Sequence, residues 1–207
     1  RNTDWPVLVC QDAWRLMPWA DKLYGCDDRW WHAHKGTAFG GEKWSSHGDA
    51  QNNDKRDIAE KYNVNLVRGV SANDKGFSTD PEFLHYGDNS GYQAINLAIL
   101  LGSPYIVLVG FNMSRPGGKG HFFGDHPAGL TNQEQYERWV PHFERAAAEL
   151  TDTVIVNATP DSALTCFPTM RLEDALANYY LYRHGSELDP RTGRDSAGDG
   201  THPLRLQ

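Results

Sequence analysis

Two histidines and an aspartate lie close together in one polar stretch, at His121, Asp125 and His126. A histidine titrates near neutral pH, so a loop histidine beside a carboxylate can serve as a general base or acid. The three residues could also hold a metal ion, although H-x4-H in a loop is not a known ligand pattern, or they could form an ordinary structural loop. We treat His126, His121 and Asp125 as candidate catalytic residues and assign no metal ligands.

A serine–glycine pair, Ser90 and Gly91, stands at the start of a predicted helix, and a buried apolar run ends at Gly110. Unhindered N–H groups and a hydroxyl at a helix start can bind an anion. Ligands of open α/β sheets lie beyond the carboxyl ends of the strands, where Gly110 falls. A capped helix and a loop glycine would look the same, so a binding site and a structural turn both stay open.

Two further polar groups follow predicted strands. Asp27 and Asp28 come directly after one apolar run, and the turn from Asn157 to Ser162 follows the last one. Carboxylates at a strand end suit ribose, sugar or metal contacts, and amide and hydroxyl groups suit a base or a phosphate. Asp28 is also a good helix cap and Ser162 a good turn residue, so neither group decides a function alone.

These candidates need a framework to position them. Short apolar runs alternate with amphipathic stretches, which is typical of a mostly parallel sheet flanked by helices. The predicted strands are Val7–Cys10, Lys22–Cys26, Asn65–Val70, Tyr105–Gly110 and Thr153–Asn157. The predicted helices are Ser90–Leu101, Thr131–Leu150 and Arg171 to about Tyr182. The expected fold is α/β and Rossmann-like, with long loops at the carboxyl ends of the strands.

Three long polar stretches separate these elements, at Gly36–Asn53, Ser71–Asn89 and Phe111–Leu130. Loops of this length in a compact domain are often lids or binding loops. One domain is expected over residues 1–183, because the chain of 207 residues is close to the usual size of one domain. Residues 184–207 lack core-forming residues and predict a C-terminal arm that is in part disordered.

The composition narrows the range of partners. A formal charge of -7 disfavours nucleic acid, which is held chiefly by clustered Lys and Arg. The apolar fraction is 39%, and no apolar run approaches the ~20 residues that span a bilayer, so a soluble protein without a membrane partner is expected. Cys10, Cys26 and Cys166 are widely spaced, which favours reduced thiols in a cytoplasmic protein. Oligomer formation stays open.

Taken in this order, the segments resemble a Rossmann-like group that includes the bacterial family 42 sialyltransferases and the MptE-like pterin diphosphokinase and DUF115 proteins. Within that group the similarity is greatest to phage and prophage proteins of unknown role, which implies the cytoplasm of a bacterial host cell. The resemblance covers roughly Val7 to Phe167 and rests on short motifs and fold order.

The resemblance implies a nucleotide site at three of the residues named above. In the sialyltransferases, a serine–glycine helix start and a strand that ends in glycine and an acidic residue line the nucleotide site. Ser90, Gly91 and Gly110 match that pattern, whereas Asn112 stands where the acidic residue is usual. Any role of that carboxylate is therefore lost or reduced to hydrogen bonding.

The resemblance also implies a catalytic histidine. The family's histidine begins a helix that leads to a strand and an Asn–Ser turn, an order that His126, Asn157 and Ser162 reproduce. His126 would then be the general base that deprotonates an acceptor hydroxyl, with His121 as the second choice.

The chain departs from the family at its start. The family begins with a strand and a Gly-x-Gly-Pro-Ser type loop that contacts the nucleotide phosphates, and nothing like it precedes Val7. Either that segment was removed from this chain or nucleotides are bound differently. A second-strand asparagine of the family is replaced here by Gln11 or Asp12.

Three functional hypotheses follow. The first is a transferase that uses a nucleotide-sugar donor, CMP-linked by analogy, and a small-molecule or glycan acceptor. The second is a diphosphotransferase of the pterin kinase type, with Mg2+ held near Asp27, Asp28 or Asp125. The third is a non-enzymatic phage or host-interaction protein with a degenerate pocket.

Overall fold

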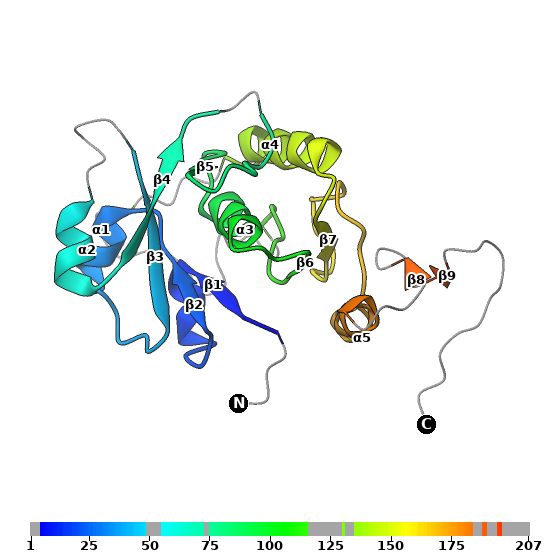
Figure 1. Ribbon diagram of the computed structural model, residues 1–207, viewed down its shortest axis with the longest axis horizontal. Helices are drawn as coiled ribbons and strands as arrows, with labels where there is room; N and C mark the ends of the chain where they lie inside the picture. The colour runs from blue at the N-terminus through cyan, green and yellow to red at the C-terminus, as the bar shows by residue number, and fades with distance from the viewer. Residues whose placement is uncertain are drawn as a thin grey trace.

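The computed structural model describes residues 5–48, 55–72, 75–115, 130, 135–183, 188–189 and 194–195. Over these residues the chain is an α/β protein with two parallel sheets, as Figure 1 shows, which confirms the expected Rossmann-like α/β class. None of the described helices combines the length and apolarity that a membrane crossing requires.

The larger sheet has five parallel strands, and each strand pairs with the one before it. Its strands, in spatial and chain order, are β1 (Leu8–Cys10), β2 (Lys22–Tyr24), β3 (Glu42–His47), β4 (Asn65–Val70) and β5 (Phe83–His85). The smaller sheet pairs β6 (Tyr105–Leu108) with β7 (Val154–Asn157), also in parallel. A short antiparallel pair, β8 (Leu188–Asp189) and β9 (Arg194–Asp195), follows near the C-terminus.

Helices connect and cover the strands. They are the 3-10 helix η1 (Gln11–Arg15), α1 (Asp28–Ala33), α2 (Arg56–Tyr62), α3 (Ser90–Leu100), α4 (Tyr136–Glu149) and α5 (Leu172–Arg183). The central element is α3, which contacts both β1 and β5, the two edge strands of the larger sheet. The larger sheet therefore curls around α3, with β6 and β7 on the other side of this helix (Figure 1).

The core falls into layers on the two sides of the strands. On one side of the larger sheet, Trp30 and Trp31 are almost fully buried and meet edge to face at 5.0 Å between ring centroids. On the other side, Ala94 and Leu97 of α3 pack against the sheet. The neighbouring Ile95 packs into the cluster of β6, β7 and α4, so a single helix joins the two sheets.

Most predicted elements are present, but two stretches that were predicted as loops contain strands. Gly36–Asn53 includes β3, and Ser71–Asn89 includes β5. In β3 the buried positions are occupied by Ser45 and Ser46, at 0% and 1% exposure, so the usual apolar signal of a central strand is missing. In β5 only three residues pair, which is too short a run to give a periodic pattern.

Candidate functional site

A cavity of about 2450 Å³ lies between β1 and β6, and its lining includes residues at the carboxyl ends of both strands. In an open α/β sheet, ligands bind beyond the carboxyl ends of strands at the point where the strand order reverses. Here the order runs outward from β1 to β5 and then returns through α3 to β6, so the cavity lies at that reversal. Its polar rim holds many of the residues selected from the sequence: Gln11, Asp12, Asp27, Ser90, Gly91, Gly110 and Asn112.

The first turn of α3 supplies hydrogen-bond donors to this rim. Asn89 caps the helix, and its side-chain oxygen accepts from the Tyr92 amide at 3.0 Å. The amides of Ser90 and Gly91 come earlier in the turn and have no hydrogen-bond partner among the described residues. Because these are the unsatisfied N–H groups that a helix start offers, an anion at this end of the cavity would be stabilised.

The end of β2 is fastened to the same turn. The Cys26 sulfur lies 2.8 Å from the Ser90 hydroxyl oxygen. Burial, more than the neighbouring Asp27 carboxylate, raises the pKa of Cys26 to about 12, so the thiol is neutral at physiological pH. A neutral S–H can donate to the Ser90 oxygen, which leaves the Ser90 hydroxyl proton for a ligand. Cys26 is thus a neutral hydrogen-bonding group here and not a nucleophile.

The end of β6 completes the rim. Gly110 has a φ of 81°, the left-handed region that favours glycine, and open space surrounds the position where a Cβ would stand. Phe111 lies against Gly91, so close that a Cβ added to Gly91 would be 2.8 Å from the Phe111 ring. The Asn112 carbonyl accepts from the Ala163 amide at 2.8 Å, which ties this loop to the turn after β7.

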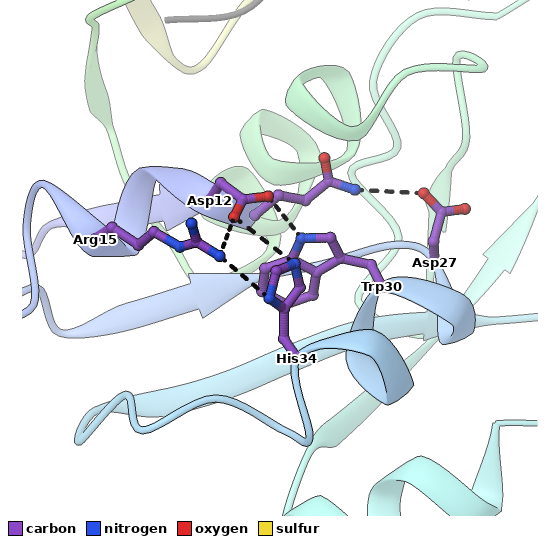
Figure 2. Close-up of polar contacts among 6 residues, drawn as sticks. Asp12, Arg15, Asp27, Trp30 and His34 are labelled. Carbon is purple, nitrogen blue, oxygen red and sulfur yellow. Dashed lines mark hydrogen bonds and ion pairs between the residues drawn. The ribbon is translucent and has the colours of Figure 1, made fainter. Parts of the chain in front are cut away.

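Asp12, at the end of β1, lies in a buried polar cluster (Figure 2). It is 2% exposed and accepts a hydrogen bond from the Trp30 indole at 2.9 Å. The Arg15 guanidinium pairs with it at 3.1 Å, and the His34 ring nitrogen Nε2 is 3.7 Å away. These neighbours compensate a buried charge, so Asp12 has a structural role in this arrangement.

His34 belongs to the same cluster in its neutral form. The Arg15 guanidinium can only donate, so the contact of 3.3 Å to His34 Nδ1 makes that nitrogen an acceptor and leaves the proton on Nε2, toward Asp12. Burial is the largest influence on this ring and lowers its pKa below the usual value, with Arg15 acting in the same direction. Asp12 acts in the opposite direction without outweighing burial.

Gln11 and Asp27 form a more open pair at the cavity mouth. The Gln11 side-chain amide donates to Asp27 at 3.3 Å, and the Asp27 side chain is exposed to solvent. Gln11 has a φ of 45°, and this left-handed backbone turns the chain from β1 into η1. A carboxylate and an amide at the ends of adjacent strands can bind the hydroxyls of a ribose or a sugar.

Asn157 and Ser162 lie apart from the cavity wall. Asn157 is fully buried, and its side-chain oxygen accepts from the Thr159 amide at 3.0 Å. The Ser162 hydroxyl donates to the Phe111 carbonyl at 2.5 Å and accepts from the Leu164 amide at 3.1 Å. The Ser162 side chain therefore holds the turn after β7 against the end of β6, and the Asn157 side chain stabilises the same turn from within. Neither side chain lines the cavity.

The candidate catalytic residues His121, Asp125 and His126 lie outside the described residues, as does the start of the predicted helix Thr131–Leu150. Over the part of the chain that is described, no three or more His, Cys, Asp and Glu side chains gather as a metal site would require. The three cysteines are all free thiols.

One part of the rim was not expected from the sequence. Asp88 lies on the cavity wall with a φ of 53°, and Arg138 of α4 donates to its carboxylate at 2.5 Å. His142, one helical turn further along α4, lies 3.8 Å from the same carboxylate. The spacing of Arg138 and His142 puts both on one face of α4, but only the fold shows that Asp88 faces them.

In comparisons with known proteins, no family model, no curated protein and no solved structure matches the chain. The chemistry therefore has to be inferred from the rim itself. Helix amides, a serine hydroxyl, a glycine with open space around it and a carboxylate–amide pair can together hold a phosphorylated ligand that also carries hydroxyl groups.

Proposed function

We propose that this protein binds a nucleotide at the rim of the cavity and acts as a nucleotide-sugar-dependent transferase. One observation carries the proposal. The amides of Ser90 and Gly91, which have no hydrogen-bond partner among the described residues, line the same cavity as the Gln11–Asp27 pair, at the reversal of the strand order. A nucleotide needs both kinds of contact, donors for its phosphates and acceptors for its ribose.

The rim residues divide between the two parts of the ligand. The amides of Ser90 and Gly91 and the Ser90 hydroxyl would bind the phosphate that leaves during transfer, where negative charge develops. Gly110 leaves room for the ligand to approach the backbone closely. Asp27 and Gln11 would hold ribose or sugar hydroxyls. His126 is the proposed base that accepts the proton of the acceptor hydroxyl, and replacing it with Ala should abolish transfer while nucleotide binding is retained.

The experiment that tests the proposal is a thermal-shift panel of CMP, CDP, UDP, GDP and ATP, each with and without Mg2+. A ligand that binds only the folded state stabilises it by about 2.7 kcal/mol at a hundred times its Kd. For a chain of this size each kcal/mol raises Tm by roughly 2–4 °C, so binding should be plain. Selective stabilisation by one nucleotide without Mg2+ supports the proposal and identifies the donor class.

The other outcomes separate the alternatives. Stabilisation that needs Mg2+ would favour diphosphate transfer, with the metal near Asp27, Asp28 or Asp125. A flat response to every nucleotide would contradict nucleotide binding and favour a non-enzymatic interaction protein.

A further inference from the structure

Two buried amide side chains lie on α3, and the protein uses them differently. Asn96 is 0% exposed, and its oxygen accepts from the backbone amides of Ser78 and His85 at 3.0 and 2.9 Å. Its nitrogen donates to the Ser78 carbonyl at 2.7 Å, so both ends of this amide are satisfied within the protein. Gln93, three residues earlier, is 6% exposed and lines the cavity between β1 and β6.

The side-chain oxygen of Gln93 is held by two hydroxyl groups. It accepts from the Tyr24 hydroxyl at 2.6 Å and from the Ser46 hydroxyl at 3.1 Å. Both donors are buried and belong to the neighbouring strands β2 and β3. Burial raises the pKa of Tyr24 well above its usual value, so the phenol keeps its proton and donates it. Turning the amide over would deprive both hydroxyl protons of this acceptor, so the oxygen stays directed at the sheet.

The other end of the same amide is not used within the described structure. The Gln93 nitrogen makes no hydrogen bond to a described residue, and since it is not sealed inside the protein, its two N–H groups are open to the cavity. An amide nitrogen donates hydrogen bonds and does not accept them. Because polar groups in largely buried positions are nearly always hydrogen-bonded, this fixed donor indicates a ligand that brings an acceptor.

Gln93 is a neighbour of the residues proposed to bind the phosphate. Ser90 and Gln93 are three residues apart on α3, a spacing that brings side chains together on one side of a helix. Two contacts side by side join them to β2 and the residues after it: Cys26 to Ser90 at 2.8 Å and Tyr24 to Gln93 at 2.6 Å. The free donor therefore lies about one helical turn beyond the helix start, within reach of another part of the same nucleotide.

The cavity wall beside Gln93 is apolar and neutral. Ala94, Cys10 and Cys26 pack in one cluster with Tyr24, and all three also line the cavity. Burial raises the pKa of both thiols, so neither carries a charge at neutral pH. Burying a charged group against such a wall is costly. The acceptor that meets Gln93 is therefore an uncharged one such as a carbonyl oxygen, whereas the charged phosphate belongs at the helix start.

We propose that Gln93 selects the base of the nucleotide by donating to a carbonyl oxygen of that base, and that Tyr24 and Ser46 are positioning residues that fix the direction of its amide. The inference rests on the proposed nucleotide site and makes its ligand more specific. An amide recognises adenine best by donating to it and accepting from it at once, and the Gln93 oxygen is already occupied. Cytosine, uracil and guanine carry a carbonyl oxygen and adenine has none, so the site favours the first three.

Isothermal titration with CDP, UDP, GDP and ADP tests the selection. These nucleotides carry the same phosphates and ribose and differ only in the base. At least one of the three carbonyl bases should bind about tenfold more tightly than ADP, because one hydrogen bond to the fixed donor is made with the carbonyl and lost with adenine. ADP that binds as tightly as the best of the other three would overturn the proposal.

Two substitutions at Gln93 assign the selection to its nitrogen. Gln93→Glu keeps an oxygen for the Tyr24 and Ser46 hydroxyls and removes the two N–H groups. Gln93→Met keeps the length of the side chain and removes both polar ends, so it serves as a second variant without a carboxylate. In both variants the ratio of the ADP dissociation constant to that of the preferred nucleotide should fall from about ten to near one. A ratio that is unchanged in both variants would overturn the role of Gln93.

Adjacent serines of β3 provide a matched pair for the positioning role. Ser45 and Ser46 are 0% and 1% exposed and neither lines the cavity, but only Ser46 donates to Gln93. Ser46→Ala should lower the preference for the carbonyl base about threefold or more, because the amide oxygen loses one of its two donors. Ser45→Ala should keep the preference. A merely structural role would lower Tm and leave the ratio of dissociation constants unchanged, so equal ratios in the two variants would overturn positioning by Ser46.

Nuclear magnetic resonance of the protein labelled with 15N observes the contact directly. The side-chain NH2 signals of Gln93 are identified by their absence in Gln93→Glu, and the preferred nucleotide should shift them at saturation. Signals that stay in place while the nucleotide binds would overturn this proposal and leave the proposed function intact. If none of the four nucleotides binds the unchanged protein, both proposals are overturned, so the two failures are distinguishable.

Discussion

The Ser90 hydroxyl oxygen lies 2.8 Å from the Cys26 sulfur, which joins the first turn of α3 to the end of β2. Since burial keeps the Cys26 thiol neutral, with its pKa raised to about 12, the thiol can donate and the serine keeps its own proton for a ligand. A structural contact and a binding group therefore coincide in one side chain. Its removal should affect nucleotide binding more than folding.

Ser90→Ala is the direct test. Loss of one hydrogen bond to a charged phosphate costs about 1.5–3 kcal/mol, so nucleotide affinity should fall at least tenfold. Ser103→Ala, at the other end of α3 on the same cavity, is the matched control and should bind as the unchanged protein does. Isothermal titration with the nucleotide selected by the thermal-shift panel measures both. Equal affinities of the two variants would remove Ser90 from the site.

The close packing around Gly91 predicts that a larger residue at this position destabilises the folded protein. A Cβ at this position would be 2.8 Å from the Phe111 ring and 3.0 Å from the Asn89 side-chain oxygen, so the contact between α3 and the end of β6 must shift. Gly91→Ala should lower the free energy of unfolding by about 1–3 kcal/mol. Gly40→Ala, where no atom lies within 4 Å of the added Cβ, should have almost no effect. Urea unfolding of both variants gives the comparison, and equal midpoints would contradict it.

Two adjacent tryptophans allow a comparison of an indole hydrogen bond to a charged acceptor with one to a neutral acceptor. The Trp30 indole donates to the buried Asp12 carboxylate, and the Trp31 indole donates to the Gly25 carbonyl, both at 2.9 Å. Trp30→Phe should cost about 1.5–3 kcal/mol for the bond and Trp31→Phe about 1 kcal/mol, with similar packing losses because both rings are buried. Urea unfolding measures the difference. A larger loss in Trp31→Phe would show that Asp12 does not depend on the indole.

The sequence predicts the framework better than the site. Long apolar runs such as Tyr105–Gly110 and the periodic pattern of Ser90–Leu101 identify β6 and α3, because burial sets their residue types. The serines of β3 do not give such a signal, although they are buried, because hydrogen bonds compensate the burial of their hydroxyl groups. The Ser46 hydroxyl, for example, donates to the side chain of Gln93 in α3 at 3.1 Å. Proximity across the fold is also invisible in one sequence.

Asp12 shows that contacts within the site, too, cannot be predicted from one sequence. Its position after a strand marks it as a candidate ligand residue, just as that of Asp27 does. Only the fold shows that Trp30, Arg15 and His34 enclose Asp12 while Asp27 stays exposed. The partners come from η1 and α1, and no pattern within one segment contains that information.

His34 gives the pH dependence of stability. Its pKa is lowered in the folded protein, chiefly by burial, so below about pH 6.5 the unfolded chain binds more protons at this residue than the folded chain does. The free energy of unfolding should therefore fall as pH decreases from about 6.5 through the lowered pKa. His34→Gln can still accept from Arg15 and donate toward Asp12 but does not titrate, so its Tm should fall less between pH 7.5 and pH 5. If Tm against pH runs parallel in the unchanged protein and His34→Gln, then His34 is not the group that titrates.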